Sequence, residues 1–216
     1  MKIFAYDGPV NQFILKVVDC FFISLLWIIT SIPIITAGAS TVALYYTVNK
    51  VVRLEEGKIW KCYWKAFFRD FWQATGIWLI LLVYYAASLA AYSGIIGMGL
   101  GGFPKGMLIT VVLVVTLWTQ YWFPYLSRFQ DKTRTLLKNT LVMLLSDFFR
   151  SVKMLVLLVL FLVVAFVSFF RFPALFVLLP AFYVYLGNGT VNKVFAKYIP
   201  DPEAEEESEE TEEPNE

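Results

Sequence analysis

The sequence predicts an all-α fold: a polytopic helical membrane protein with about six transmembrane helices and two cytoplasmic amphipathic segments. Of its 216 residues, 59% are hydrophobic and only 16% are charged. The apolar residues form long uncharged blocks, and about 18 or more such residues are enough to cross a bilayer core of about 30 Å. Runs such as 155–160 show no alternation of polar and apolar residues, which excludes the strands of a membrane barrel and leaves helices.

The uncharged blocks place six spans in a single membrane domain, residues 1–200. Their ranges are about 13–35, 38–52, 71–96, 106–127, 152–170 and 173–190. The first two are short, because Lys16 and Lys50 both belong near the cytoplasmic boundary and two full spans need about 40 residues. Pro33, Gly38 and Ala39 are therefore expected to make a tight turn between two short helices. A hairpin that re-enters the membrane without fully crossing it is the alternative.

The distribution of charge predicts the orientation. The chain has 18 lysines and arginines, and all except Lys105 and Arg171 fall on one side of the predicted spans. By the positive-inside rule, both termini and the basic loops lie in the cytoplasm, and the protein belongs to the cell inner (plasma) membrane. Residues 201–216 are strongly acidic and have no apolar anchor, so we expect a disordered cytoplasmic tail.

The residue pattern predicts amphipathic helices in two cytoplasmic segments. In residues 60–71, Trp60, Trp64, Phe67 and Phe71 fall on one face and the basic residues to one side. A weaker copy of this arrangement covers 134–148. Such helices suit the membrane interface, with aromatic rings among the headgroups and cations toward anionic lipid. They either pack beneath the bundle or form a docking platform for a partner, for which the candidate residues are Lys61, Lys65 and Arg69.

The same two regions contain a weak internal repeat. Phe67-Phe68-Arg69 and Phe148-Phe149-Arg150 are 81 residues apart, and Arg53 and Arg134 share this offset. The predicted unit is a span, a basic amphipathic segment and another span, repeated in the same direction, as in some transporters. Chance similarity between apolar sequences is the alternative.

The chain offers little that could carry catalysis. It has no histidine, and it shows no set of residues typical of a catalytic, metal-binding or cofactor-binding site, nor of nucleic-acid binding. Asp19 is the only acidic residue within a predicted span, where charged groups are often functional. It could couple transport to protons or ions, or it could form an interfacial ion pair with Lys16, three residues before it.

A series of short motifs resembles one family. The most specific stretch is 33–46, Pro-Ile-Ile-Thr-Ala-Gly-Ala-Ser-Thr-Val-Ala-Leu-Tyr-Tyr, which follows Asp19 and Leu25-Leu26-Trp27. Later landmarks are Val52-Arg53, Glu56-Gly57, Gln73-Ala74-Thr75, Phe123-Pro124, Arg128-Phe129 and Leu137-Lys138-Asn139. From about residue 11 to 192 the chain resembles the YesL-like integral membrane proteins, a family of unknown biochemical function. The candidate structural or functional residues within these landmarks are Asp19, Pro33, Gly38, Arg53, Pro124, Arg128 and Asn139.

The resemblance implies a role in carbohydrate uptake, because genes of this family often lie beside oligosaccharide importers of the ATP-binding-cassette type. We therefore expect a non-enzymatic membrane protein that is accessory to such an importer, with the lipid bilayer and importer subunits as partners. The alternative is a small transporter or channel in its own right. Its aqueous path would be lined by the few polar groups of the spans: Gln73, Thr75, Ser88, Thr116, Thr119 and Ser168. The oligomeric state is left open.

Overall fold

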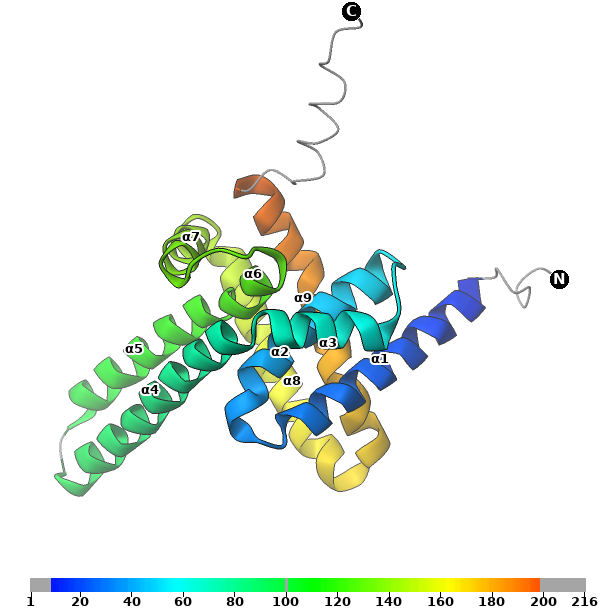
Figure 1. Ribbon diagram of the computed structural model, residues 1–216. Helices are drawn as coiled ribbons and strands as arrows, with labels where there is room; N and C mark the ends of the chain where they lie inside the picture. The colour runs from blue at the N-terminus through cyan, green and yellow to red at the C-terminus, as the bar shows by residue number, and fades with distance from the viewer. Residues whose placement is uncertain (1–8, 100, 199–216) are drawn as a thin grey trace, which may run out of the picture.

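In the computed structural model, which describes residues 9–99 and 101–198, every regular element is a helix (Figure 1). The first half comprises α1 (Pro9–Ser31), a 3-10 turn η1 (Ile34–Thr36), α2 (Ala37–Thr47), a π-helical segment η2 (Val48–Arg53), α3 (Ile59–Arg69) and α4 (Phe71–Gly97). The second half comprises α5 (Gly102–Thr119), α6 (Trp122–Arg128), α7 (Thr133–Ser146), α8 (Phe148–Arg171) and α9 (Pro173–Tyr198). The acidic tail, 201–216, lies outside the described residues.

Five helical segments are long and apolar enough to cross a membrane, which confirms a polytopic helical membrane protein. They are Ile14–Ser31, Phe71–Gly97, Gly102–Arg128, Phe148–Arg171 and Leu175–Phe195. The segment predicted as the remaining span, 38–52, is the exception. It consists of the 11 residues of α2 continued without a break by the 6 residues of η2. At about 1.5 Å per residue this segment is about 26 Å long, shorter than a bilayer core of about 30 Å.

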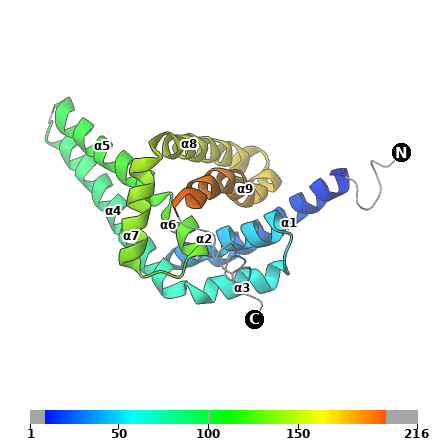
Figure 2. The ribbon, with the colours of Figure 1, turned by 90° about the horizontal axis from the view of Figure 1, so that it is seen from above.

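The helices form hairpins whose turns lie at a common end of the molecule. In Figure 1, the turns between α1 and α2, α4 and α5, and α8 and α9 all lie toward the bottom. The opposite end carries α3, α7 and the C-terminal end of α9 (Figures 1 and 2). We call this opposite end the basic end, since α3 and α7 hold Lys61, Lys65, Arg134 and Lys138. The other end is called the loop end.

The short helix α2 lies at the centre of the packing. Eight of its 11 residues are buried, and it contacts α1, α3, α4 and α6. Small side chains allow this, because Gly38, Ala39, Ser40 and Ala43 let neighbouring backbones approach closely, as is usual between helices in membranes. The chain enters α2 through a turn at Pro33, whose carbonyl oxygen accepts hydrogen bonds from the Thr36 amide (2.9 Å) and hydroxyl (2.8 Å). Gly38 and Ala39, which were expected to belong to this turn, lie within α2 instead.

A serine on α1 contacts α9 at its internal proline. Pro180 has no N–H, so the helix loses one backbone hydrogen bond there. One residue later, the Ala181 amide donates to Oγ of Ser24 at 2.9 Å, and that hydroxyl lies 3.5 Å from the carbonyl oxygen of Leu178. Ser24 and Ala181 are fully buried. The serine thus holds α1 and α9 together where the proline disturbs the backbone of α9.

A second proline accounts for the break between α5 and α6. The helical backbone is interrupted at Gln120 and Tyr121. Pro124 lies four residues after Gln120, so it provides no donor for the Gln120 carbonyl, and its ring collides with that carbonyl in a straight helix. The buried Pro124 therefore ends α5 and turns α6 onto α2, which it contacts extensively.

The two copies of the Phe-Phe-Arg motif, 81 residues apart, do not occupy equivalent positions in the fold. Phe67-Phe68-Arg69 closes α3, whereas Phe148-Phe149-Arg150 opens α8. The two copies lie on opposite sides of a corner between an amphipathic helix and a span. The residues at the two corners are Asp70, before α4, and Asp147, before α8. Both halves thus share an order of elements, but the motif that indicated the repeat is shifted by about one helical turn.

We predict that Gly38→Ala destabilises the fold, because a Cβ at Gly38 would lie 2.5 Å from the carbonyl oxygen of Ala74 and from Cβ of Trp78. Overpacking of this kind costs about 1–3 kcal/mol, and backbone atoms cannot give way easily. The measurement is the melting temperature in mild detergent. Gly76→Ala is the matched control on α4, since a Cβ there meets nothing within 4 Å. An equal melting temperature for the two variants would contradict the close packing of α2 on α4.

Candidate functional site

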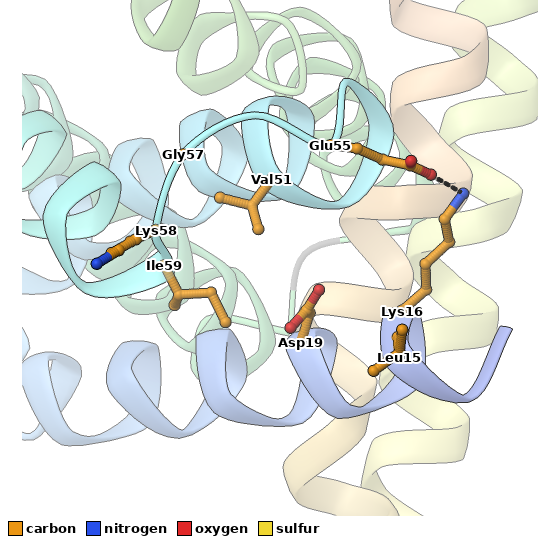
Figure 3. Close-up of a pocket in the computed structure, with 8 residues that line it drawn as sticks. All are labelled: Leu15, Lys16, Asp19, Val51, Glu55, Gly57, Lys58 and Ile59. Atoms are coloured by element: carbon orange, nitrogen blue, oxygen red, sulfur yellow. Dashed lines mark ion pairs between the residues drawn. The ribbon is translucent and has the colours of Figure 1, made fainter. Parts of the chain in front are cut away.

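A cavity of about 480 Å³ lies between α1 and the loop that leads into α3 (Figure 3). Leu15, Lys16 and Asp19 line it from α1, and Val51 lines it from η2. The remaining wall comes from the loop and the start of α3: Glu55, Gly57, Lys58 and Ile59. The cavity thus combines an apolar wall with two acidic and two basic side chains, and it lies at the basic end of the molecule.

The backbone around this cavity departs from regular helix in two ways. Val48–Arg53 forms a π-helix, a rare conformation that is frequent at functional sites. Glu55 then adopts a left-handed conformation with φ of 59°, which costs a non-glycine residue about 1–2 kcal/mol. Gly57, with φ of 81°, completes the turn into α3. The left-handed backbone at Glu55 and Gly57 brings the Glu55 carboxylate back over α1.

An ion pair closes one side of the cavity. Nζ of Lys16 lies 3.0 Å from Oε1 of Glu55, and both side chains are partly exposed (Figure 3). The expected pairing of Lys16 with Asp19 is therefore wrong: the lysine reaches across to the loop instead. Within the described part of the chain Asp19 has no ion-pair partner, and its carboxylate points into the cavity. Glu55 was not a candidate from the sequence, although the Glu-Glu-Gly run after a helix indicates a helix end.

Helix α3 is fixed to the bundle by its buried side. The hydroxyl of Tyr63 lies 2.6 Å from Oγ1 of Thr30 on α1, and burial raises the pKa of Tyr63 to about 12. The phenol is therefore neutral at physiological pH and remains available for this hydrogen bond. Ala66 and Phe67 complete the buried side. Phe67 was expected to lie among the lipid headgroups on one face with Trp60, Trp64 and Phe71. This is wrong for Phe67, because it packs in the core.

The outer side of α3 carries two stripes. Trp60 and Phe68 are largely exposed and flank Trp64, whose ring lies 5.6 Å and 5.5 Å from theirs, centroid to centroid. Lys61 and Lys65 are exposed on the adjacent stripe. This order of buried, aromatic and basic faces is typical of a helix that lies in the plane of a membrane interface.

The side chain of Arg69, the remaining candidate docking residue, is engaged in contacts within the protein. Its guanidinium forms an ion pair with Asp70 at 2.5 Å and donates to the carbonyl oxygen of Ser127 at 3.3 Å. It also lies over the ring of Tyr46, 5.1 Å from the centroid. Asp70 is only 6% exposed. Arg69 therefore joins α3 to α2 and α6. Of the three candidate docking residues, only Lys61 and Lys65 are exposed and make no ion pair within the described residues.

The candidates in the second half lie in another cluster at the basic end. The Asn139 amide donates to the Tyr125 hydroxyl at 2.8 Å, and that hydroxyl donates to Asp131 at 2.5 Å. Arg128 lies over the ring of Phe195, 5.7 Å from its centroid. These contacts join α6, α7 and α9.

Arg53 lies apart from that cluster, on η2. With the Asn192 amide oriented so that its oxygen faces η2, Nη1 of Arg53 donates to it. Asp19 is thus the only one of the seven candidate structural or functional residues that lines the cavity. The others position helices: Pro33, Gly38, Arg53, Pro124, Arg128 and Asn139.

The described residues include no group of three or more His, Cys, Asp or Glu side chains that could hold a metal ion. Cys20 and Cys62 are both buried and unpaired. The cavity itself offers charge, a carboxylate without an ion-pair partner among the described residues, and an apolar wall, an arrangement that can bind a ligand.

Comparison with known proteins gives one match. Residues 20–92 match a family described as "Protein of unknown function, DUF624". The matched region runs from within α1 to within α4 and contains α2, α3 and the cavity wall from Val51 to Ile59. Leu15, Lys16 and Asp19, which line the cavity from α1, precede it. No curated protein and no solved structure matches the chain.

We predict that Asp19→Asn leaves the free energy of unfolding within about 0.5 kcal/mol of the wild type, because the side chain is partly exposed and has no ion-pair partner. Glu55→Gln, which removes the partner of Lys16, should cost up to about 1 kcal/mol, as exposed ion pairs do. Unfolding in detergent measures both variants. A loss of more than about 2 kcal/mol for Asp19→Asn would mean that the carboxylate is structural.

Proposed function

We propose that this protein is a non-enzymatic accessory protein of an oligosaccharide importer of the ATP-binding-cassette type, and that it docks through the basic surface of α3. The resemblance to the YesL-like membrane proteins supports the connection with sugar uptake. The observation that carries the docking surface is the arrangement of Lys61 and Lys65, both exposed on a helix whose opposite side is buried. In this proposal both termini and the basic end lie in the cytoplasm, where the nucleotide-binding subunits of such importers are found.

The rigidity of α3 supports a recognition surface. Its side chains reach α1 through Tyr63, and α2 and α6 through Arg69. A surface held on three sides presents its lysines in a fixed geometry, so little conformational entropy is lost when a partner binds. Complementary charge would then set the orientation and rate of association.

A second candidate function is a small transporter, which the unpaired Asp19 carboxylate in its cavity favours. A transporter also needs polar groups along a path through the spans. The hydroxyls of Ser88, Thr116 and Thr119 donate to carbonyl groups of their own helices. These three groups are satisfied locally, whereas the Thr75 hydroxyl is buried without a hydrogen-bond partner among the described residues. One such group does not form a path through the spans, and the accessory role is the better supported of the two.

We predict that the double variant Lys61→Glu/Lys65→Glu inserts normally but loses copurification with importer subunits at least about tenfold, because like charges across an interface cost several kcal/mol. Arg69 is left unchanged, since its replacement would disturb the fold. Growth on an oligosaccharide should slow and growth on glucose should not. Copurification in mild detergent followed by mass spectrometry is the measurement.

The matched control is Arg134→Glu/Lys138→Glu, which makes the same change of charge on α7. Importer subunits should still copurify with this variant. Equal retention in both variants would remove the docking role from α3. Equal loss in both would assign the effect to the net charge of the basic end and not to a specific surface.

A further inference from the structure

A second cavity, an apolar groove of about 540 Å³, opens between α4, α5 and α8. Figures 1 and 2 show the α4–α5 hairpin diverging from the α8–α9 hairpin toward the loop end. Tyr92 of α4, Ile109 and Leu113 of α5 and Val159 of α8 are among its lining residues. All three helices are long and apolar enough to span a membrane, so the groove faces the bilayer interior.

Three of the four polar side chains that line the groove are already engaged, whereas the Tyr92 hydroxyl makes no hydrogen bond among the described residues. The hydroxyl of Tyr85 lies 3.0 Å from Oγ1 of Thr116, and Thr116 donates to the carbonyl oxygen of Val112 at 2.8 Å. Ser88 donates to the carbonyl oxygen of Tyr84 at 2.8 Å. What the groove offers to an occupant is therefore hydrocarbon surface, and its occupant must be apolar.

The start of α5, at the loop end of this groove, carries a lysine. Lys105 on α5 lies three and four residues before Leu108 and Ile109, which line the groove, so it shares their helix face. Neither α4 nor α5 contains an acidic residue. A positive charge above a hydrocarbon groove matches the chemistry of a phospholipid, with its anionic phosphate above an acyl chain.

The size of the groove decides between a lipid chain and a helix. A helix is about 10–12 Å wide, so about 540 Å³ would enclose roughly one turn of it. A transmembrane helix of a partner, with about 20 residues, would fill far more space than this. An acyl chain is much narrower and can follow the groove along its length.

We propose that the groove between α4, α5 and α8 binds one acyl chain of a phospholipid whose phosphate is held by Lys105. The lipid fills the space where the two hairpins diverge and adds to the direct contact between α5 and α8. It belongs to the leaflet at the loop end. This site is separate from the docking surface of α3, and neither proposal depends on the other.

The test uses phosphatidylglycerol with a photoreactive diazirine in its acyl chain, added to the full-length protein in vesicles. Irradiation followed by peptide mapping should give crosslinks concentrated in α4, α5 and α8 at the groove. Ile109→Trp, which fills the groove, should abolish them. Val111→Trp is the matched control on α5, at an exposed position outside the groove, and should leave them unchanged. Lys105→Gln should lower crosslinking about fivefold, as expected for one lysine near an anionic headgroup.

Crosslinks spread evenly over the exposed apolar faces of the spans would overturn the proposal, because they would show no preferred site. Crosslinks that survive Ile109→Trp would do the same. A crosslink between two protein chains at Leu113→Cys would show that the groove is filled by protein and not by lipid. The mapping on the wild-type protein decides the matter even where a tryptophan variant fails to fold.

Discussion

The structure depends on one constraint: inside a bilayer, no water is present to satisfy a backbone group that has lost its partner. The chain responds to this constraint differently at Pro180 and at Pro124. At Pro180 the hydroxyl of Ser24 on α1 accepts from the backbone of α9, and at Pro124 the chain bends so that α6 packs on α2. Each proline thereby becomes a point of contact between helices. Apolar burial contributes little to helix association in lipid, so such polar contacts and close packing of small residues define the arrangement.

The central position of α2 connects this constraint to function. Because α2 is short and made of small residues, α4 and α6 approach it closely within the membrane, and Gly38 is the position of closest approach. Its continuation, η2, extends to the basic end, where a π-helical segment and the left-handed Glu55 form the cavity around Asp19. The rigid packing of α2 on α3 fixes the lysines of α3 at the same end. The candidate site and the docking surface are thus two sides of one loop region.

The sequence was sufficient to predict five of the six spans and the amphipathic helices, because length, hydropathy and charge determine them locally. The sixth predicted span, 38–52, is the short buried segment of α2 and η2. The sequence was not sufficient to predict which apolar side of a helix faces protein, since lipid and core are equally apolar; Phe67 was therefore placed on the wrong face of α3. It was also not sufficient for contacts between residues far apart in the chain. The Lys16–Glu55 pair and the contact of Arg69 with the Ser127 carbonyl depend on the packing of helices, and neither leaves a periodic signal.

We propose that the basic end and the loop end lie on opposite sides of a membrane, with the basic end in the cytoplasm. Single cysteines at Lys65 and Gly101 test it most directly, in a background with Cys20→Ala and Cys62→Ala; the native cysteines are buried and report poorly. In intact cells an impermeant maleimide should label Gly101→Cys, and it should label Lys65→Cys only after the membrane is permeabilised. Labelling of Lys65→Cys in intact cells, or of both sites from the same side, would contradict the account.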